Sequence, residues 1–166
     1  MDYSNIRMLI AKKEYRAAGG LIDSYLSKDN ENHYLWYLRG TASLGAKNYN
    51  SALECFEKAL SIKKEFEYFR AMGITYFEKL DFEEAIIEFE NALKIKKDSE
   101  IYFYISLCCM FLEDPRSKDF METAYFRNRK KTKELLVSLY DKVLKDSREL
   151  SDKQKKELEK IIKSIK

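Results

Sequence analysis

The sequence predicts an all-α fold, an α-solenoid of stacked helix pairs with a C-terminal helical pair. Three observations predict it. Five residues of one segment recur 33 positions further along the chain, and a fixed period of this length is typical of repeat architectures. Apolar residues follow helical spacing over most of the 166 residues. Five Gly and one Pro leave few helix breakers and strand signals are absent, so we expect an almost wholly helical chain.

The repeated segment combines small and aromatic residues. The recurring pairs are Trp36 and Phe69, Gly40 and Gly73, Ala52 and Ala85, Phe56 and Phe89, and Ala59 and Ala92. Two closely packed helices need small residues where their backbones approach, and aromatic side chains fill the space beside them. Asn48 and Asp81 precede the second helix of each copy and are predicted N-caps. Asp81 has Glu84 three residues later, which is the capping-box arrangement.

This order of residues resembles the tetratricopeptide repeat, whose signature runs W-x2-L-G-x2-Y, then A-x3-F and a closing Pro. Trp36 and Gly40 stand at the Trp and Gly of the signature, and Ala52 and Phe56 match A-x3-F. The sequence departs from the signature at Arg39 and Met72 in place of Leu, Ser43 in place of Tyr, and Lys64 and Lys97 in place of Pro. The resemblance implies helix–turn–helix units that must stack, because no single pair buries its apolar face alone.

We expect a single helical-repeat domain. The residue 34 positions before Ala52 is Ala18, which lies in an apolar helical pattern and predicts a degenerate first repeat. The residue 33 positions after Gly73 is Ser106, which predicts a degenerate fourth repeat lacking one residue of its inter-helix turn near Asp114. Terminal repeats are expected to be atypical because one side faces water. The predicted repeats are 1–31, 33–64, 66–97 and 99–128, followed by C-terminal helices within 131–166, at 131–145 and 151–165.

The residues that usually carry catalysis or metal binding are scarce. The chain has no Gly-rich phosphate loop and no nucleophile-elbow motif. His33 is the only histidine, so no His-based metal or catalytic constellation can form, and we expect it to be a surface or capping residue. Cys55, Cys108 and Cys109 are expected to be reduced, buried, small hydrophobic residues. The sequence therefore predicts a non-enzyme without metal or cofactor.

The chain is expected to be soluble and cytoplasmic. Its first 14 residues lack the apolar core of a secretory signal. The longest uncharged apolar run, Ile101 to Leu112, has 12 residues and is too short to cross a bilayer.

The resemblance also implies where a partner would bind, because the first helix of each tetratricopeptide repeat lines a concave groove. The groove residues predicted in this way are Tyr34, Tyr37, Thr41, Arg70, Ile74, Phe77, Phe103, Leu107 and Met110. Family members that hold a chaperone's C-terminal carboxylate use a clamp of Lys, Asn and Arg, whereas here Arg70 alone could meet a carboxylate. We therefore expect a protein–protein interaction scaffold or adaptor. It would anchor a partner peptide or helix in an aromatic, apolar groove.

The run Ile101 to Leu112 leaves an alternative open. A helix that is apolar all round is normally buried all round. The C-terminal helix, a second copy of the chain or a partner peptide could cover it. The chain could therefore be a self-associating structural protein whose groove is filled by its own C-terminal helix or by a second copy. The partner, the state of the groove, the oligomeric state, the pathway and the source cannot be read from the sequence.

A second candidate surface is basic. Residues 1–126 carry a net charge of −4 and residues 127–166 carry +7, and five of the seven residues 127–133 are basic. Such a cluster can contact phosphates, acidic partners or membranes, so a nucleic-acid or anionic-surface binder is a further alternative. The favoured interpretation is nevertheless a solvated helix end, since cations near a helix C-terminus complement the dipole, and a nucleic-acid partner is not expected. The candidate residues are Arg127, Arg129, Lys130, Lys131 and Lys133.

Overall fold

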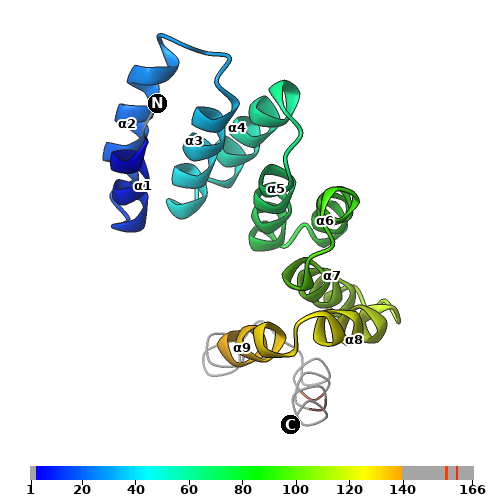
Figure 1. Ribbon diagram of the computed structural model, residues 1–166. Helices are drawn as coiled ribbons and strands as arrows, with labels where there is room; N and C mark the ends of the chain where they lie inside the picture. Colours follow the sequence, from blue (N-terminus) through cyan, green and yellow to red (C-terminus); the bar gives the residue numbers. More distant parts are fainter. Residues whose placement is uncertain (1–2, 140–155, 157–159, 161–166) are drawn as a thin grey trace. The chain divides into compact units, whose positions relative to one another are not determined.

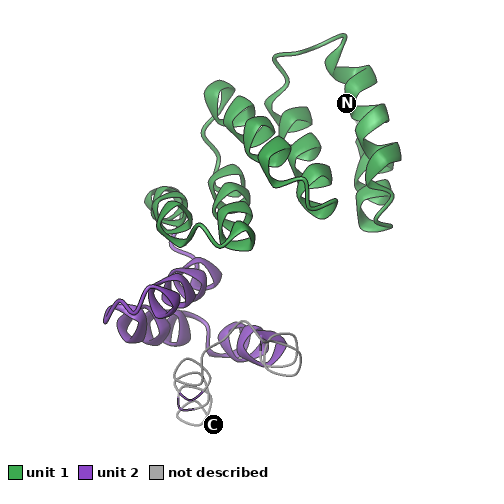
Figure 2. Cartoon of the chain, turned by 180° about the vertical axis from the view of Figure 1, so that it is seen from behind, with its two compact units in different colours: residues 1–96 green, residues 97–166 purple. Residues whose placement is uncertain are grey.

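The structure is a computed structural model that describes residues 3–139 together with residues 156 and 160. These residues form helices and no strand. The chain divides into two compact units, residues 1–96 and residues 97–166 (Figure 2). Except for residues 156 and 160, which are helical, the predicted helix at 151–165 lies outside the described residues, as does the end of the predicted helix at 131–145.

The first unit consists of three helix pairs (Figure 1). Within each pair the two helices pack together, and the first helices also contact one another, α1 with α3 and α3 with α5. The first helices therefore form one shared face, which positions the candidate site. The helices are α1 Ser4–Ala11, α2 Tyr15–Leu26, α3 His33–Gly45, α4 Tyr49–Ile62, α5 Phe66–Lys79 and α6 Phe82–Ile95.

The second unit contains a fourth helix pair and one further helix. The pair is α7 Ser99–Phe111 and α8 Ser117–Arg127, and α9 is described from Arg129 to Leu139. Both α7 and α8 contact α9. None of the helices in the described part of the chain is long and apolar enough to cross a membrane.

The repeated small and aromatic residues do pack against each other. A Cβ atom added to Gly40 would lie 2.5 Å from Cε1 of Phe56, and one added to Gly73 would lie 2.6 Å from Cδ1 of Phe89. Both rings are fully buried. Glycine is therefore required at these two positions because a phenylalanine ring occupies the space of a side chain.

The fourth pair replaces this packing with serines. Ser106 stands at the place of the glycine, and its carbonyl accepts a buried hydrogen bond of 3.0 Å from Oγ of Ser117. Met121 stands where the two good copies have phenylalanine, and its flexible side chain fills irregular space. In this pair the glycine and the phenylalanine are therefore replaced together: the side chain of Ser106 occurs where no phenylalanine ring would clash with it.

The four inter-helix turns share one conformation that the sequence did not predict. Each contains a non-glycine residue with positive φ, and these residues recur every 33 or 34 positions: Lys13 at 63°, Lys47 at 60°, Leu80 at 68° and Glu113 at 56°. The next N–H donates to the carbonyl five residues earlier in every turn, at 2.8–3.0 Å. Glu113 lies 33 residues after Leu80, so the fourth turn itself has the usual spacing. The residue that the fourth repeat lacks is therefore missing after the turn, between Asp114 and Ser117.

Two of the predicted helix caps are only partly confirmed. Asn48 and Asp81 do occupy the N-cap positions of α4 and α6, but neither side chain makes a capping hydrogen bond. The predicted capping box is therefore wrong. The Asp81 carboxylate instead pairs with Nζ of Lys79 at 2.9 Å, across the turn.

Candidate functional site

The candidate site in the first unit is formed by α1, α3 and α5. Tyr34, Tyr37 and Thr41 follow helical spacing along α3, and the predicted residues of α5 follow the same kind of spacing. All six predicted residues of this unit are half-buried, so part of each remains open to a partner. We define the aromatic face as these six residues with Tyr3 of α1's N-cap: Tyr3, Tyr34, Tyr37, Thr41, Arg70, Ile74 and Phe77.

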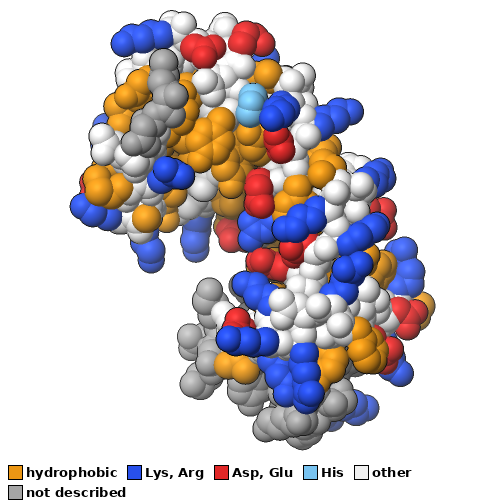
Figure 3. Space-filling model, in the orientation of Figure 1, with side chains coloured by type: hydrophobic (Ala, Val, Ile, Leu, Met, Phe, Trp, Pro, Cys, Tyr) orange, Lys and Arg blue, Asp and Glu red, His pale blue; other side chains and the backbone are white. Residues whose placement is uncertain are grey.

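A line of aromatic rings crosses this face. Tyr3 lies between Tyr25 and Tyr34, with ring centroids 5.8 Å apart in both contacts. Tyr34 continues to Tyr37 at 5.9 Å, and Tyr37 stacks on Tyr68 at 4.9 Å. In Figure 3, hydrophobic side chains gather beside the pale-blue histidine of the first unit. The rings hold one another in place, which limits the entropy that they lose when a partner binds.

The hydroxyls of Tyr68 and Tyr37 have raised pKa values and stay protonated in neutral solution. Burial raises the pKa of Tyr68 to about 12, with a further contribution from the negative charge of Glu65. Burial also raises the pKa of Tyr37, and the carboxylate of Glu67 adds to it. At Tyr37 the face therefore presents a neutral phenol, which can donate a hydrogen bond as well as pack.

Arg70 is the only cationic residue among the six predicted residues of this face. Its Nη1 atom lies 3.5 Å from a carboxylate oxygen of Glu67, one turn earlier on α5. Both side chains are partly exposed, so the pair is weak and solvent-screened. That Arg70 could meet a carboxylate on a partner stays a prediction.

His33 differs from its prediction. It begins α3, but the cap is Asn32, whose side chain accepts a hydrogen bond from the N–H of Leu35 at 3.2 Å. His33 is half-buried, and its Nδ1 atom shares a 2.6 Å hydrogen bond with the hydroxyl of Tyr68 on α5. The histidine is therefore neither a free surface residue nor the cap. It joins two neighbouring first helices behind the line of rings.

The predicted groove residues of the second unit are not on its surface. Phe103, Leu107 and Met110 are 2%, 1% and 4% exposed, as expected for the apolar helix that contains them. Within this unit α9 packs on α7, with Leu136 and Thr132 also buried. These three residues could bind a partner only after α7 was uncovered, so the candidate surface is restricted to the first unit.

The basic segment has a different setting from the one predicted. Only Arg127 lies at a helix C-terminus, because α8 ends there and α9 begins two residues later. Asn128 joins the helices, and its side-chain oxygen accepts from the N–H of Lys131 at 3.0 Å. Arg129, Lys130, Lys131 and Lys133 therefore lie in the first turns of α9. Cations at this end of a helix oppose the dipole, so helix stability does not explain them.

Two of these cations rest on aromatic rings. The guanidinium of Arg127 lies 5.5 Å from the ring centroid of Tyr102, and that of Arg129 lies 5.5 Å from the ring of Tyr125. Phe126, which stands between Tyr125 and Arg127 in the sequence, is 84% exposed. The sequence shows that Tyr125 and Phe126 precede the basic segment, but it did not predict that the cations and rings would pack or that Phe126 would face solvent.

A search of curated protein sequences found no match. The family model described as tetratricopeptide repeat matches residues 33–66, which include α3 and α4. Residues 33–66 are a tetratricopeptide repeat. The resemblance stated from Trp36, Gly40, Ala52 and Phe56 is thus confirmed for this segment.

Solved structures extend the likeness beyond that one tetratricopeptide repeat. A crystal structure of MamA aligns over 99% of this chain and 93% of its own, with a TM-score of 0.74 and 15% identity. MamA from residue 41 onward, of Desulfovibrio magneticus RS-1, aligns over 97% and 93%, with a TM-score of 0.73 and 15% identity. YrrB, described as a TPR protein with an unusual peptide-binding site, aligns over 97% and 82%, with a TM-score of 0.70 and 18% identity. These likenesses confirm the predicted fold, an all-α helical-repeat solenoid.

Sequence reasoning missed three members of the line of rings. Tyr68 stands 33 residues after Leu35, a core position of the tetratricopeptide repeat, so the period carried a signal for its burial. Tyr3 and Tyr25 belong to the degenerate first pair, where no matching copy identifies a role. Their place on the face follows from the packing of α1 and α2 on α3, which the sequence pattern did not specify.

Proposed function

We propose that the chain is a non-catalytic scaffold whose first unit binds a peptide or helix of a partner protein across the aromatic face. The observation that carries this proposal is the line of tyrosine rings, of which Tyr3, Tyr34 and Tyr37 are half-buried and so remain open to a partner. Such rings combine a large apolar area with a polar tip and are enriched at protein interfaces. Ile74 and Phe77 extend the apolar area along α5.

The chemistry of the face suggests the kind of partner. Apolar anchors spaced along a peptide or an amphipathic helix would pack on the rings, and its polar groups would meet the phenols. Arg70 adds one site for a carboxylate. Because most of the face is uncharged, we expect binding to depend only weakly on salt.

Matched isoleucine substitutions test this proposal. Ile74 is on the aromatic face, whereas Ile87 is on α6 and is 56% exposed. In cell lysate, a photo-crosslinking benzoylphenylalanine at position 77 is expected to label a partner protein that mass spectrometry identifies. With the purified partner, I74E is expected to weaken binding at least tenfold, and I87E is expected to leave it unchanged.

The same variants separate a foreign partner from self-association. If crosslinks at position 77 join two copies of this chain, and if I74E alone converts a dimer to a monomer in sedimentation, the face is a homotypic interface. Equal binding by the I74E and I87E variants would contradict a role for the aromatic face. Circular dichroism of both variants shows whether the helices are intact.

A second candidate function rests on the basic segment. Cations placed against the α9 dipole, beside an exposed Phe126, suit a surface that contacts phosphates through charge and an unpaired base through stacking. This alternative predicts an affinity for single-stranded nucleic acid that falls steeply with salt. F126A and R129Q are expected to weaken that affinity separately. An affinity that does not change with salt would exclude it.

A further inference from the structure

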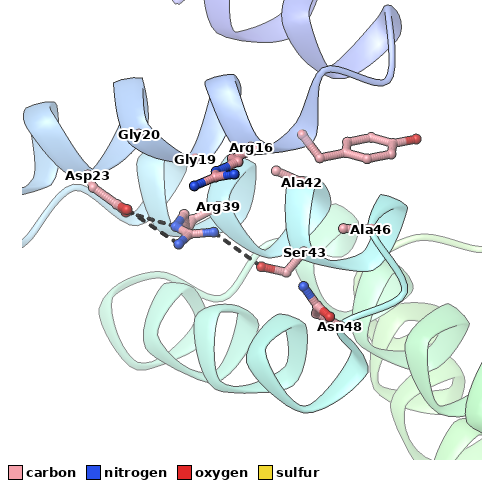
Figure 4. A pocket seen from close by; sticks show the side chains of 10 residues that line it. Arg16, Gly19, Gly20, Asp23, Arg39, Ala42, Ser43, Ala46 and Asn48 are labelled. Carbon is pink, nitrogen blue, oxygen red and sulfur yellow. Dashed lines mark hydrogen bonds and ion pairs between the residues drawn. The ribbon is translucent and has the colours of Figure 1, made fainter.

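A cavity lies on the other side of α3 from the aromatic face. It has a volume of about 550 Å³ and lies among α2, α3 and the start of α4 (Figure 4). On α3 it is lined by residues 39, 42, 43 and 46, which helical spacing places away from residues 34, 37 and 41. It is lined by Tyr15, Arg16, Gly19, Gly20, Asp23, Arg39, Ala42, Ser43, Ala46 and Asn48.

Arg39 has unused donors in this cavity. Asp23 accepts from its Nε atom at 2.8 Å and from its Nη2 atom at 3.3 Å, so the fork of the guanidinium is already engaged on one side. Among the residues that the structure describes, the Nη1 atom has only Ser43 Oγ, at 3.4 Å, a distance beyond that of a well-formed hydrogen bond. Arg39 stands where the tetratricopeptide signature has leucine, so the signature itself does not call for a charge here.

Ser43 has a buried hydroxyl group that can still donate a hydrogen bond. It is 4% exposed, and in the described part of the chain its side chain is recorded only as the acceptor of the long contact from Arg39. Its own proton has no recorded acceptor there. Ser43 also departs from the signature, which has tyrosine at this place. A hydroxyl directed at an empty cavity beside a guanidinium is placed to donate to an anion.

Arg16 supplies a second cation. Its side chain is exposed, and among residues 3–139 no hydrogen bond or ion pair is recorded for it. Figure 4 shows its guanidinium over the α2 wall, which also carries Gly19 and Gly20. The charged residues lining the cavity are thus two arginines and one aspartate, which leaves one positive charge in excess.

Glycines keep this wall of the cavity open. Gly19 and Gly20 lie inside α2, where glycine destabilises a helix relative to alanine. Gly19 has a packing reason, because an added Cβ would lie 3.2 Å from Nη1 of Arg39. Packing does not explain Gly20, because a Cβ atom added there would have no described atom within 4 Å. The missing side chain leaves space that the described chain does not fill.

The start of α4 adds the positive end of a helix dipole. Asn48 is the N-cap of this 14-residue helix, yet its side chain makes no capping hydrogen bond, unlike Asn32 on α3. Asn48 lines the cavity, and no acceptor is assigned to its side-chain amide among residues 3–139, so the amide can donate into the cavity. An anion there would gain from the helix terminus as well as from the arginines.

We propose that this cavity binds a phosphoryl group carried by a small molecule. Arg16 and Arg39 would supply charge, and Ser43 and Asn48 would supply neutral donors. A tetrahedral phosphate suits donors that come from three elements in different directions. A planar carboxylate needs only one bidentate arginine, which Arg16 alone could supply, and would leave Ser43 and Asn48 unused. The remaining volume would hold the organic part of the ligand beside Tyr15. This proposal does not depend on a partner at the aromatic face.

The test is a titration of the full-length protein with inorganic phosphate, followed by amide and arginine side-chain NMR signals at constant ionic strength. We expect saturable shifts at residues 16, 19, 20, 39, 43 and 48. R16Q is expected to weaken phosphate at least about tenfold, because a charged hydrogen bond is lost. G20L is expected to abolish binding by filling the cavity, and unchanged signals in α5 and α6 would show that it folds.

R7Q on α1 is the matched control and is expected to bind phosphate like the unmodified chain. Non-saturating shifts, or equal phosphate affinities for the R16Q and R7Q variants, would overturn the site. Acetate is the competing probe. If acetate binds as tightly as phosphate, the assignment to a phosphoryl group is wrong.

Discussion

At the scale of single residues, the glycines of this chain differ in what surrounds them, and alanine substitutions should separate them. Gly40 faces the ring of Phe56, so G40A is expected to lower the free energy of unfolding by about 1–3 kcal/mol through overpacking. Gly20 faces open space, so G20A is expected to raise it by about 0.5–1 kcal/mol. Urea denaturation of both variants measures the difference. A stabilising G40A would contradict the close helix approach.

Glu88 should make stability depend on pH. Burial raises its pKa above 4.5, and the charge of Glu57 adds to this. The folded state then binds the proton more tightly than the unfolded state. The resulting stability is complete below pH 4.5 and is lost as the pH rises through the raised pKa. E88Q is therefore expected to raise the melting temperature near neutral pH and to leave it almost unchanged in acid. E90Q, at an exposed position of α6, is the control, and an equal effect of both substitutions would contradict the role of burial.

Single residues also show how far the sequence could predict contacts. The contacts between small and aromatic residues were predictable because two copies of the repeat have the same residue types at positions 33 residues apart. The contacts of Arg39 with Asp23 and of His33 with Tyr68 occur once each. No second copy marks them, and they join different helix pairs, so they depend on the register between neighbours.

At the scale of helices, α9 should contribute to the core of the second unit. Leu136 is 3% exposed, whereas the adjacent Val137 is 59% exposed. L136A is expected to lower the free energy of unfolding by about 2–5 kcal/mol because it leaves a cavity. V137A is expected to change it by less than about 0.5 kcal/mol. Circular dichroism during urea denaturation gives both values, and equal effects would mean that α9 is not held on α7.

The helices themselves were largely predictable, but their boundaries in the basic segment were not. Spacing of apolar residues marks the buried side of a helix, and the basic residues 129–133 carry no such spacing. The helix therefore appeared to begin at residue 131, although Asn128 caps it and Arg129 is its first residue. This shift changes the meaning of the cations. It moves Arg129 and Lys130 from a connection between helices into the first turn of α9, where Lys131 follows them.

At the scale of the whole molecule, the repeat period predicted the order of the helix pairs but not how cooperatively they unfold. In a repeat protein each pair contacts mainly its neighbours, so stability is the sum of local terms. The sequence predicts one domain, while packing divides the chain at residues 96 and 97. These two descriptions differ in a measurable quantity, the region over which a core substitution is felt.

Substituting Leu35 and following hydrogen exchange measures the extent of that region. Leu35 is 1% exposed in a core cluster with Ile6, Ile22 and Leu38. L35A removes contacts of the first unit, so hydrogen exchange in α1–α4 is expected to become at least tenfold faster. Exchange in α7 and α8 should stay unchanged if the two units unfold separately. If protection falls by the same factor in both units, the chain unfolds as one cooperative domain. The division by packing would then have no counterpart in stability.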